Sequence, residues 1–264
     1  MTRPAVAEGV WAWSPAAGLR PVEGTAAEGP LLVADSWLVH DGRVRGLERH
    51  RERFVRSCGE CAGPPSYRML EFWQAMTDVL PRRGEWFPRV ELTTRHVRLR
   101  LRPAPPLGTE VRVLAAGQAD PRTVPRRKGP DLDVLAAVRT RASVDGADEA
   151  VLVDPTGVVL ETATASVLWW EDDTLCLPSP RLPVLPGVTV ALIQERALHT
   201  GVRIAHRERT LPELDGREVW LVNALHGIRP VTEWTGGPLK AAPAERAPEW
   251  RAWLDDIMEP LPEK

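Results

Sequence analysis

Lys128 is of a residue type that forms covalent bonds to aldehydes, and it stands at an unusual point of the chain. It lies where the arginine-rich stretch PRTVPRRKGP turns into a predicted helix. A neutral lysine amine attacks an aldehyde, whereas an arginine stays protonated and does not. Because a lysine just before a helix is usually an ordinary surface charge, covalent chemistry at Lys128 requires partners elsewhere in the sequence.

Glu161 is the first such partner. It lies among apolar and small residues in VVLETATASVLWW. A carboxylate in these surroundings is costly unless a positive group lies beside it. Glu161 therefore either ends a strand at the surface or balances the charge of a protonated ring nitrogen.

Two further stretches expose polar backbone. In LPGVTVAL, Gly187 precedes a predicted helix whose first N–H groups suit a phosphate, and Thr189 adds a hydroxyl. In VNALHGIRPV, Asn223 and Ala224 begin a turn after a buried strand. An amine, an anionic counter-charge and a phosphate site are together what pyridoxal phosphate requires. The amine forms a Schiff base, the carboxylate keeps the ring nitrogen protonated, and the helix end holds the phosphate.

The elements of the first half are predicted from periodicity. LLVADSWLVHDGRVRGL predicts a strand, a turn at Asp41-Gly42 and a second short strand, and LERHRERFVRSC predicts a helix. RHVRLRLRP alternates apolar residues with arginines, which predicts a half-buried strand whose arginine row is a solvated sheet face. The stretch AAGQADPRTVPRR then has the composition of a linker between two lobes.

The second half begins with a helix after Lys128, which Asp131 is placed to cap. Strands over EAVLVD and VVLETATASVLWW follow, then a helix that ends at Gly201 and a buried strand over EVWLVN. The last 25 or so residues, rich in Pro, Ala and Glu, are expected to be loosely organised. The predicted division is a smaller α/β lobe over 1–118, a linker over 119–127 and a larger lobe over 128–264.

The composition is that of an ordinary globular protein. Of 264 residues 43% are hydrophobic and 27% charged, and the net charge of −2 gives no reason to expect nucleic acid or a membrane surface as a partner. No stretch is long and apolar enough to cross a bilayer, and we expect a cytoplasmic protein. The CGEC stretch lacks the second pair of ligands that a structural zinc requires, so free thiols and no metal are expected.

Three stretches together resemble class IV aminotransferases: GADEAVLVDPTGVVLETATASVLWW, LPGVTVALIQERA and VNALHGIRPV. This family of fold-type IV pyridoxal-phosphate enzymes includes branched-chain and D-amino-acid aminotransferases and aminodeoxychorismate lyases. The resemblance implies a two-lobe α/β fold with the cofactor between the lobes. It also implies a homodimer and a small-molecule substrate, either an amino acid or an amino-chorismate-like compound.

The resemblance assigns a role to each matching residue. Lys128 would form the Schiff base and move the substrate's α proton, and Glu161 would pair with the pyridine nitrogen. The arginine of the family's H-x-x-R helix matches Arg53 in HRERF and would bind the phosphate, whereas His50 is expected to pack or cap. The full cofactor-binding set implied is Arg53, Lys128, Glu161, Thr162, Gly187, Val188, Thr189, Asn223 and Ala224.

The chain departs from the family pattern at several positions. Asp131 and Asp133 occupy the region where a tyrosine often follows the lysine, and Ser166 and Val190 stand where asparagine and arginine are common. The usual amino-terminal signature, which shapes the substrate pocket, is reduced to LLVADSW. Three functions are therefore considered: amino transfer between an amino acid and a 2-oxo acid, a lyase that releases pyruvate, and a non-catalytic binding module.

Overall fold

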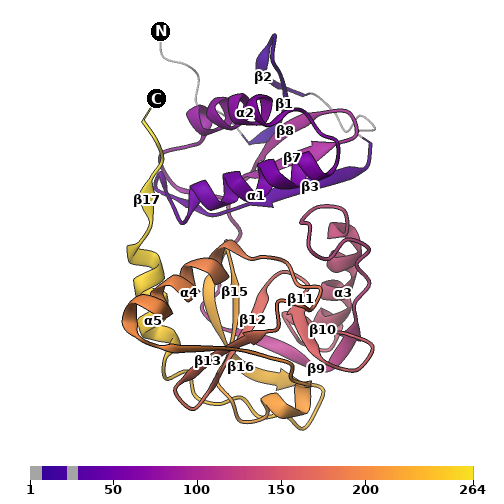
Figure 1. Cartoon of the computed structure of the whole chain (residues 1–264), viewed down its shortest axis with the longest axis vertical. Helices are drawn as coiled ribbons and strands as arrows, with labels where there is room; N and C mark the ends of the chain where they lie inside the picture. Colours follow the sequence, from indigo (N-terminus) through magenta and orange to yellow (C-terminus); the bar gives the residue numbers. More distant parts are fainter. Residues whose placement is uncertain (1–7, 23–28, 264) are drawn as a thin grey trace. The chain divides into compact units, whose positions relative to one another are not determined.

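The computed structural model describes residues 8–22 and 29–263, which belong to two compact units (Figure 1). The first unit comprises Met1–Leu107, Arg127–Pro130 and Ile257–Lys264, and the second comprises Gly108–Arg126 and Asp131–Asp256. The predicted first lobe ends at residue 118, eleven residues later than this boundary. Within the described residues, none of the helices is long and apolar enough to cross a membrane.

The first unit is built on an antiparallel sheet in the order β2-β1-β8-β7-β3. Helices α1 and α2 pack against each other, and α1 packs on β3 (Figure 1). A small second sheet has the order β17-β5-β4-β6. The bounds are β1 Gly9–Ser14, β2 Gly18–Pro21, β3 Leu31–Ser36, β4 Val39–His40, β5 Arg43–Val44, α1 Leu47–Glu60, α2 Ser66–Val79, β6 Glu85–Trp86, β7 Arg89–Thr93, β8 Val97–Leu101 and β17 Glu259–Pro260.

The predicted strand, turn and helix at the start of this unit are confirmed. Asp41 and Gly42 both have positive φ, at 46° and 74°, as a tight two-residue hairpin turn requires. Helix α1 buries Phe54, which packs against aromatic rings of α2 at centroid distances of 6.2 Å. These rings form the core on the helix-covered face of the sheet.

The arginine row of β8 is not a solvated face, contrary to the prediction. Arg98 is buried and donates to Glu91, which lies directly opposite on β7 and is fully buried. Arg89 and Arg100 also pair with this carboxylate. An alternating pattern shows which residues share a face, but it does not reveal a buried counter-charge on the neighbouring strand.

The second unit is built on a mixed sheet in the order β11-β10-β9-β16-β15-β12-β13-β14. Strand β11 also pairs with β12, so six of these strands close into a ring. The bounds are β9 Val111–Ala119, α3 Leu132–Val144, β10 Glu149–Val153, β11 Val159–Thr162, β12 Ser166–Glu171, β13 Thr174–Pro178, α4 Val188–Thr200, β14 Arg203–Arg207, the 3₁₀ helix Leu211–Leu214, β15 Val219–Asn223, β16 Gly227–Thr235 and α5 Ala247–Asp256.

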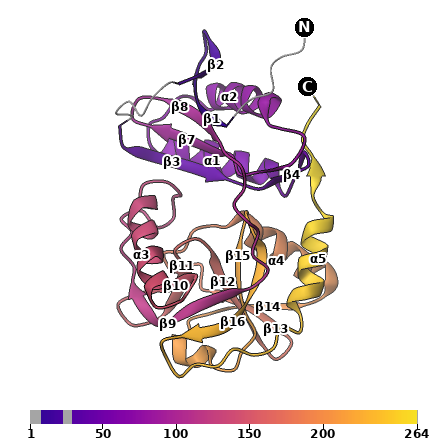
Figure 2. The same ribbon diagram turned by 180° about the vertical axis from the view of Figure 1, so that it is seen from behind.

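Inward-facing apolar side chains fill this ring. Val113, Val167, Trp169 and Leu221 are among the buried members of its core. Helix α3 packs on β9 and β10, α4 on β14 and β15, and α5 on β16 (Figure 2). The closed ring thereby holds the ends of β9, β11 and β15, and the loop before α4, in fixed places.

Two sequence predictions about this part of the chain are wrong. The linker composition of AAGQA belongs to the last residues of β9, which pairs with β10 and β16 in the sheet. The last 25 residues are not loosely organised, because they include α5, whose Trp250 packs edge-on against Trp170 at 5.9 Å, and β17, which pairs with β5. Tertiary packing of tryptophans here overrides a composition that favours coil.

Candidate active site

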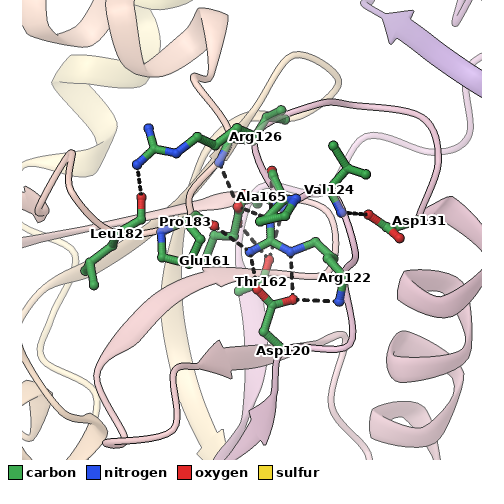
Figure 3. Close-up of polar contacts among 12 residues, drawn as sticks. Asp120, Arg122, Val124, Arg126, Asp131, Glu161, Thr162, Ala165, Leu182 and Pro183 are labelled. Carbon is green, nitrogen blue, oxygen red and sulfur yellow. Dashed lines mark hydrogen bonds and ion pairs between the residues drawn. The ribbon is translucent and has the colours of Figure 1, made fainter. Parts of the chain in front are cut away.

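Glu161 is a buried carboxylate held by two donors of its own unit. It lies on β11, and its Oε1 accepts hydrogen bonds from Nη1 of Arg122 and from the backbone N–H of Leu185, the latter at 2.8 Å (Figure 3). Burial raises the pKa of Glu161, and Arg122 and the Leu185 N–H oppose that effect. A buried Glu161 was predicted to need a positively charged partner, and Arg122 is that partner.

The turn after Glu161 is closed by its own polar groups. The hydroxyl of Thr162 donates to the carbonyl of Ala165 at 3.1 Å and accepts from its N–H at 3.0 Å. Glu161 and Ser166 are the residues at which β11 pairs with β12. The hydroxyl of Thr162 is therefore engaged in shaping the turn that presents the carboxylate.

The start of α4 lies against this turn. A Cβ on Gly187 would come within 3.1 Å of the Ser166 hydroxyl and 3.2 Å of Val190, so a larger residue would push the turn away. Gly187 provides no side-chain cap, and Val188 and Thr189 are buried in the first turn of the helix. The first N–H groups of a helix are left without partners inside the helix, which suits an anion.

Asn223 fixes the turn between β15 and β16. Its amide nitrogen donates to the carbonyl of Thr164 at 3.3 Å, and its amide oxygen accepts from the N–H groups of Leu225 and His226 at 3.1 and 2.8 Å. The side chain thus ties the Glu161–Ser166 turn to the turn that contains Ala224. The second unit brings together Glu161, Thr162, Gly187, Val188, Thr189, Asn223 and Ala224 in connected turns.

Lys128 lies in the first unit, not in the second to which the sequence assigned it. The short segment Arg127–Pro130 is grouped with β3, and the N–H of Ala34 donates to the Lys128 carbonyl at 2.8 Å. A Cβ on Gly129 would come within 2.9 Å of the backbone of Val33 and Ala34. Gly129 also has a φ of 137°, so glycine is required for this close approach.

A buried polar network lies on β3 and α1 near Lys128. Asp35 is fully buried and accepts four hydrogen bonds at 2.8 Å, from Nε and Nη2 of Arg53, Nδ1 of His50 and the N–H of Ser36. Burial opposes ionisation of Asp35, but Arg53 and His50 outweigh it and lower the pKa. An ionised carboxylate only accepts, so Nδ1 of His50 carries the proton.

His50 is neutral in this network. Burial lowers its pKa most, Asp35 raises it, and the charges of Arg53 and Lys128 lower it further. Lys128 is therefore close enough to His50 for its charge to be felt. His50 packs in the core, as expected, and tilts against the ring of Trp37 at a centroid distance of 5.4 Å.

Arg53, the predicted phosphate ligand, is buried and forms a two-point bond to Asp35. Arg53 therefore stabilises the first unit through its bond to Asp35, and it is not an exposed residue on the surface of α1. Neither Asp35 nor Arg122 was predicted from the sequence to be a site residue, although the stretches LLVADSW and PRTVPRR contain them. A carboxylate inside an apolar strand (LLVADSW) and an arginine two residues after Asp120 were the available signals.

Asp131 does not cap the helix that follows Lys128. It occupies the position before α3 but makes no side-chain bond to the helix. Its carboxylate accepts instead from the N–H and hydroxyl of Thr123 and the N–H of Val124, at 2.8–3.0 Å. Asp131 therefore braces the loop in which Arg122 lies.

Comparison with known proteins identifies the class. A family model described as amino-transferase class IV matches residues 32–234, which is most of the chain. The chain belongs to the class IV amino-transferase family. These are pyridoxal-phosphate-dependent enzymes, so the predicted family, enzyme class and cofactor are confirmed, and the non-catalytic binding module is set aside.

Individual relatives are more distant. The aminodeoxychorismate lyase of Vibrio harveyi is 31% identical over 101 residues, a match that spans 37% of each chain. The Escherichia coli branched-chain amino acid aminotransferase is 18% identical, with a TM-score of 0.77 over 98% of this chain and 97% of that one. A hypothetical aminotransferase from Mycobacterium tuberculosis, in its PLP-bound form, is 19% identical with a TM-score of 0.74, over 94% and 98% of the two chains. These structures confirm the fold-type IV α/β class.

The residues in each unit fit the cofactor of this family. The second unit offers a buried carboxylate for a ring nitrogen and, next to it, a helix start that lacks a side-chain cap, suited to a phosphate. The first unit offers the Lys128 amine, whose charge acts on His50. Arg53 fits less simply, because two of its donors are already engaged by Asp35.

Glu161→Gln tests the role of the carboxylate. We expect cofactor binding to be retained and turnover to fall by ~10²–10³-fold, because glutamine has the same size but cannot hold a proton on the ring nitrogen by charge. Activity and cofactor binding measured on the same preparation separate the two effects. Unchanged turnover would show that Glu161 is only structural.

Proposed function

We propose that the protein transfers an amino group between an amino acid and a 2-oxo acid, with Lys128 and Glu161 acting on one pyridoxal phosphate. The observation that carries the proposal is the pairing of a buried, arginine-held carboxylate with an uncapped helix start in the same unit. Lys128 adds the amine. It is one of three lysines in the sequence, and the other two, Lys240 and Lys264, follow the last matching motif.

Each residue has a task that its chemistry permits. Pyridoxal phosphate, when bound, supplies a ring that accepts the electrons released at the substrate's α-carbon. Glu161 would hold the proton on the ring nitrogen, and the start of α4 with Thr189 would hold the phosphate. The Lys128 amine would take the α proton and return it, which requires the neutral form of the amine.

The reaction is tested by supplying amino acid donors with and without a 2-oxo acid acceptor. We expect a new amino acid to form from the acceptor in proportion to the donor consumed. An absorption band in the visible on addition of pyridoxal phosphate to the purified protein is expected first. A protein that binds the cofactor but forms no amino acid from any acceptor would overturn the amino-transfer proposal.

The second candidate is a lyase that releases pyruvate from an amino-chorismate-like compound. The partial identity with the Vibrio harveyi aminodeoxychorismate lyase favours it. Pyruvate released without any amino acceptor, and at a rate independent of added 2-oxo acid, would identify the lyase.

We further propose a homodimer in the cytoplasm. The support is the family alone, whose members usually complete one protomer's site with the other's first lobe. Sedimentation at micromolar concentration should give twice the 29.3 kDa chain mass. A monomer at that concentration would remove the assembly from the proposal and leave the fold unaffected.

A further inference from the structure

We propose that Arg122 is the positioning residue for Glu161. In this role it fixes one carboxylate oxygen and favours the ionised form of the group, so that the other oxygen serves as the acceptor for the cofactor's ring nitrogen. The inference rests on the proposed function for its ligand. The arrangement of the side chains themselves does not depend on that function.

Hydrogen bonds from every N–H group fix the guanidinium of Arg122 in place. Its side chain is 5% exposed, and each of its five N–H donors has an acceptor. Nε and Nη2 donate to the two oxygens of Asp120 at 2.8 and 2.7 Å. Nη1 donates to Glu161 and to the carbonyl of Pro125, and Nη2 also reaches the carbonyl of Pro183 at 2.9 Å (Figure 3).

These acceptors lie on the segments that form the site. Asp120 directly follows β9, Glu161 is the second-last residue of β11, and Pro183 lies in the loop that leads to α4. One side chain therefore sets the distance between the carboxylate and the loop before the phosphate-binding helix start. A lysine could not do the same, because an ammonium has three donors and no planar fork.

When Glu161 is ionised, the cluster of Asp120, Arg122 and Glu161 carries one net negative charge. Asp120 and Arg122 form a neutral, two-point pair, and Glu161 is added to it. Both bonds to Glu161 within the described residues go to Oε1, from Arg122 and Leu185. Oε2 is therefore the oxygen left to accept from a protonated ring nitrogen, and the surplus negative charge favours that cation.

Arg126 provides a matched control within the same loop. Its Nη2 donates to the carbonyls of Pro180, Arg181 and Leu182, at 2.8, 3.1 and 2.7 Å. It thus tethers the loop before α4, as Arg122 does, without a bond to Glu161. Arg126→Met should lose hydrogen bonds to the loop before α4. Arg122→Met should lose both its hydrogen bond to that loop and its hydrogen bond to the Glu161 carboxylate.

The test is a double-mutant cycle on the full-length protein. Arg122→Met is expected to lower turnover at saturating pyridoxal phosphate by ~10–100-fold in the parent and by less than ~3-fold in the Glu161→Gln background. Arg126→Met is expected to have the same small effect in both backgrounds. Equal losses from Arg122→Met in both backgrounds would overturn the proposal, because Arg122 would then act only as a loop tether.

A second readout needs no cofactor. Without Arg122, only the Leu185 N–H opposes the effect of burial on Glu161, so we expect an infrared band of a protonated carboxyl in the apo Arg122→Met protein at neutral pH. The band should be absent from Arg122→Met/Glu161→Gln and from Arg126→Met. If the parent binds no pyridoxal phosphate, the proposed function fails, and this band still decides whether Arg122 controls Glu161. Its absence from Arg122→Met would contradict the inference.

Discussion

Lys128→Arg should abolish turnover, with a loss of at least ~10⁴-fold, while the protein remains folded. Arginine keeps the positive charge, and its backbone keeps the hydrogen bond from Ala34 to the carbonyl of residue 128. A guanidinium does not give up its proton at any ordinary pH, so it neither bonds to the aldehyde nor takes the α proton. The effect is measured as the rate of product formation with saturating cofactor.

Lys240→Arg is the matched control for that substitution. It makes the same change of side chain at a position after the last family motif and should leave the rate unchanged. Circular dichroism of both variants should overlay that of the parent. Residual activity above one part in a hundred in Lys128→Arg would show that the lysine is not the essential amine.

Asp35→Asn should destabilise the protein by ~3–5 kcal/mol, the largest stability effect that we expect. Asparagine preserves the shape of the site but leaves the buried Arg53 guanidinium without its counter-charge. The change is measured as a lower urea midpoint with an unchanged slope. Glu48→Gln, a carboxylate-to-amide change in an exposed pair with Arg51 on α1, should shift stability by less than ~0.5 kcal/mol.

The hydrogen bonds of Asp35 also predict how the difference in free energy of unfolding between the parent and Asp35→Asn depends on pH. Because the pKa of Asp35 is lowered in the folded state, its contribution is fully present above the unfolded value, about pH 4, and is lost as the pH falls below it. The difference in free energy of unfolding between the parent and Asp35→Asn should therefore become smaller below about pH 4. A gap that stays constant from pH 7 to pH 3 would show that ionisation of Asp35 is not what stabilises the unit.

Local features of this fold were predictable because local physics decides them. The Asp41-Gly42 turn follows from two residues that tolerate positive φ, and α4 follows from Gly187 before it and Gly201 after it. Glu161 could be singled out because an apolar stretch makes a lone carboxylate conspicuous. The residues that hold these features in place over long sequence separations were not predictable.

Arg122 and Lys128 illustrate why contacts over long sequence separations could not be predicted from the sequence. The partners of Arg122 include Glu161, 39 residues away, and the loop at Pro183. The local sequence indicates Asp120 as a partner, but it does not indicate these distant ones. Lys128 belongs to the first unit because a glycine lets its segment approach β3, a contact between residues almost a hundred positions apart. Arg98 is similar, since its burial depends on Glu91 across the sheet.

Reductive trapping identifies the amine that bonds to the cofactor. The protein is incubated with pyridoxal phosphate, reduced with borohydride, digested and mapped by mass spectrometry. With three lysines in the sequence, we expect the cofactor's mass on the peptide that contains Lys128 and on neither Lys240 nor Lys264. A label on either of those residues, or no label on folded protein supplied with cofactor, would contradict the assignment of Lys128 as the catalytic amine.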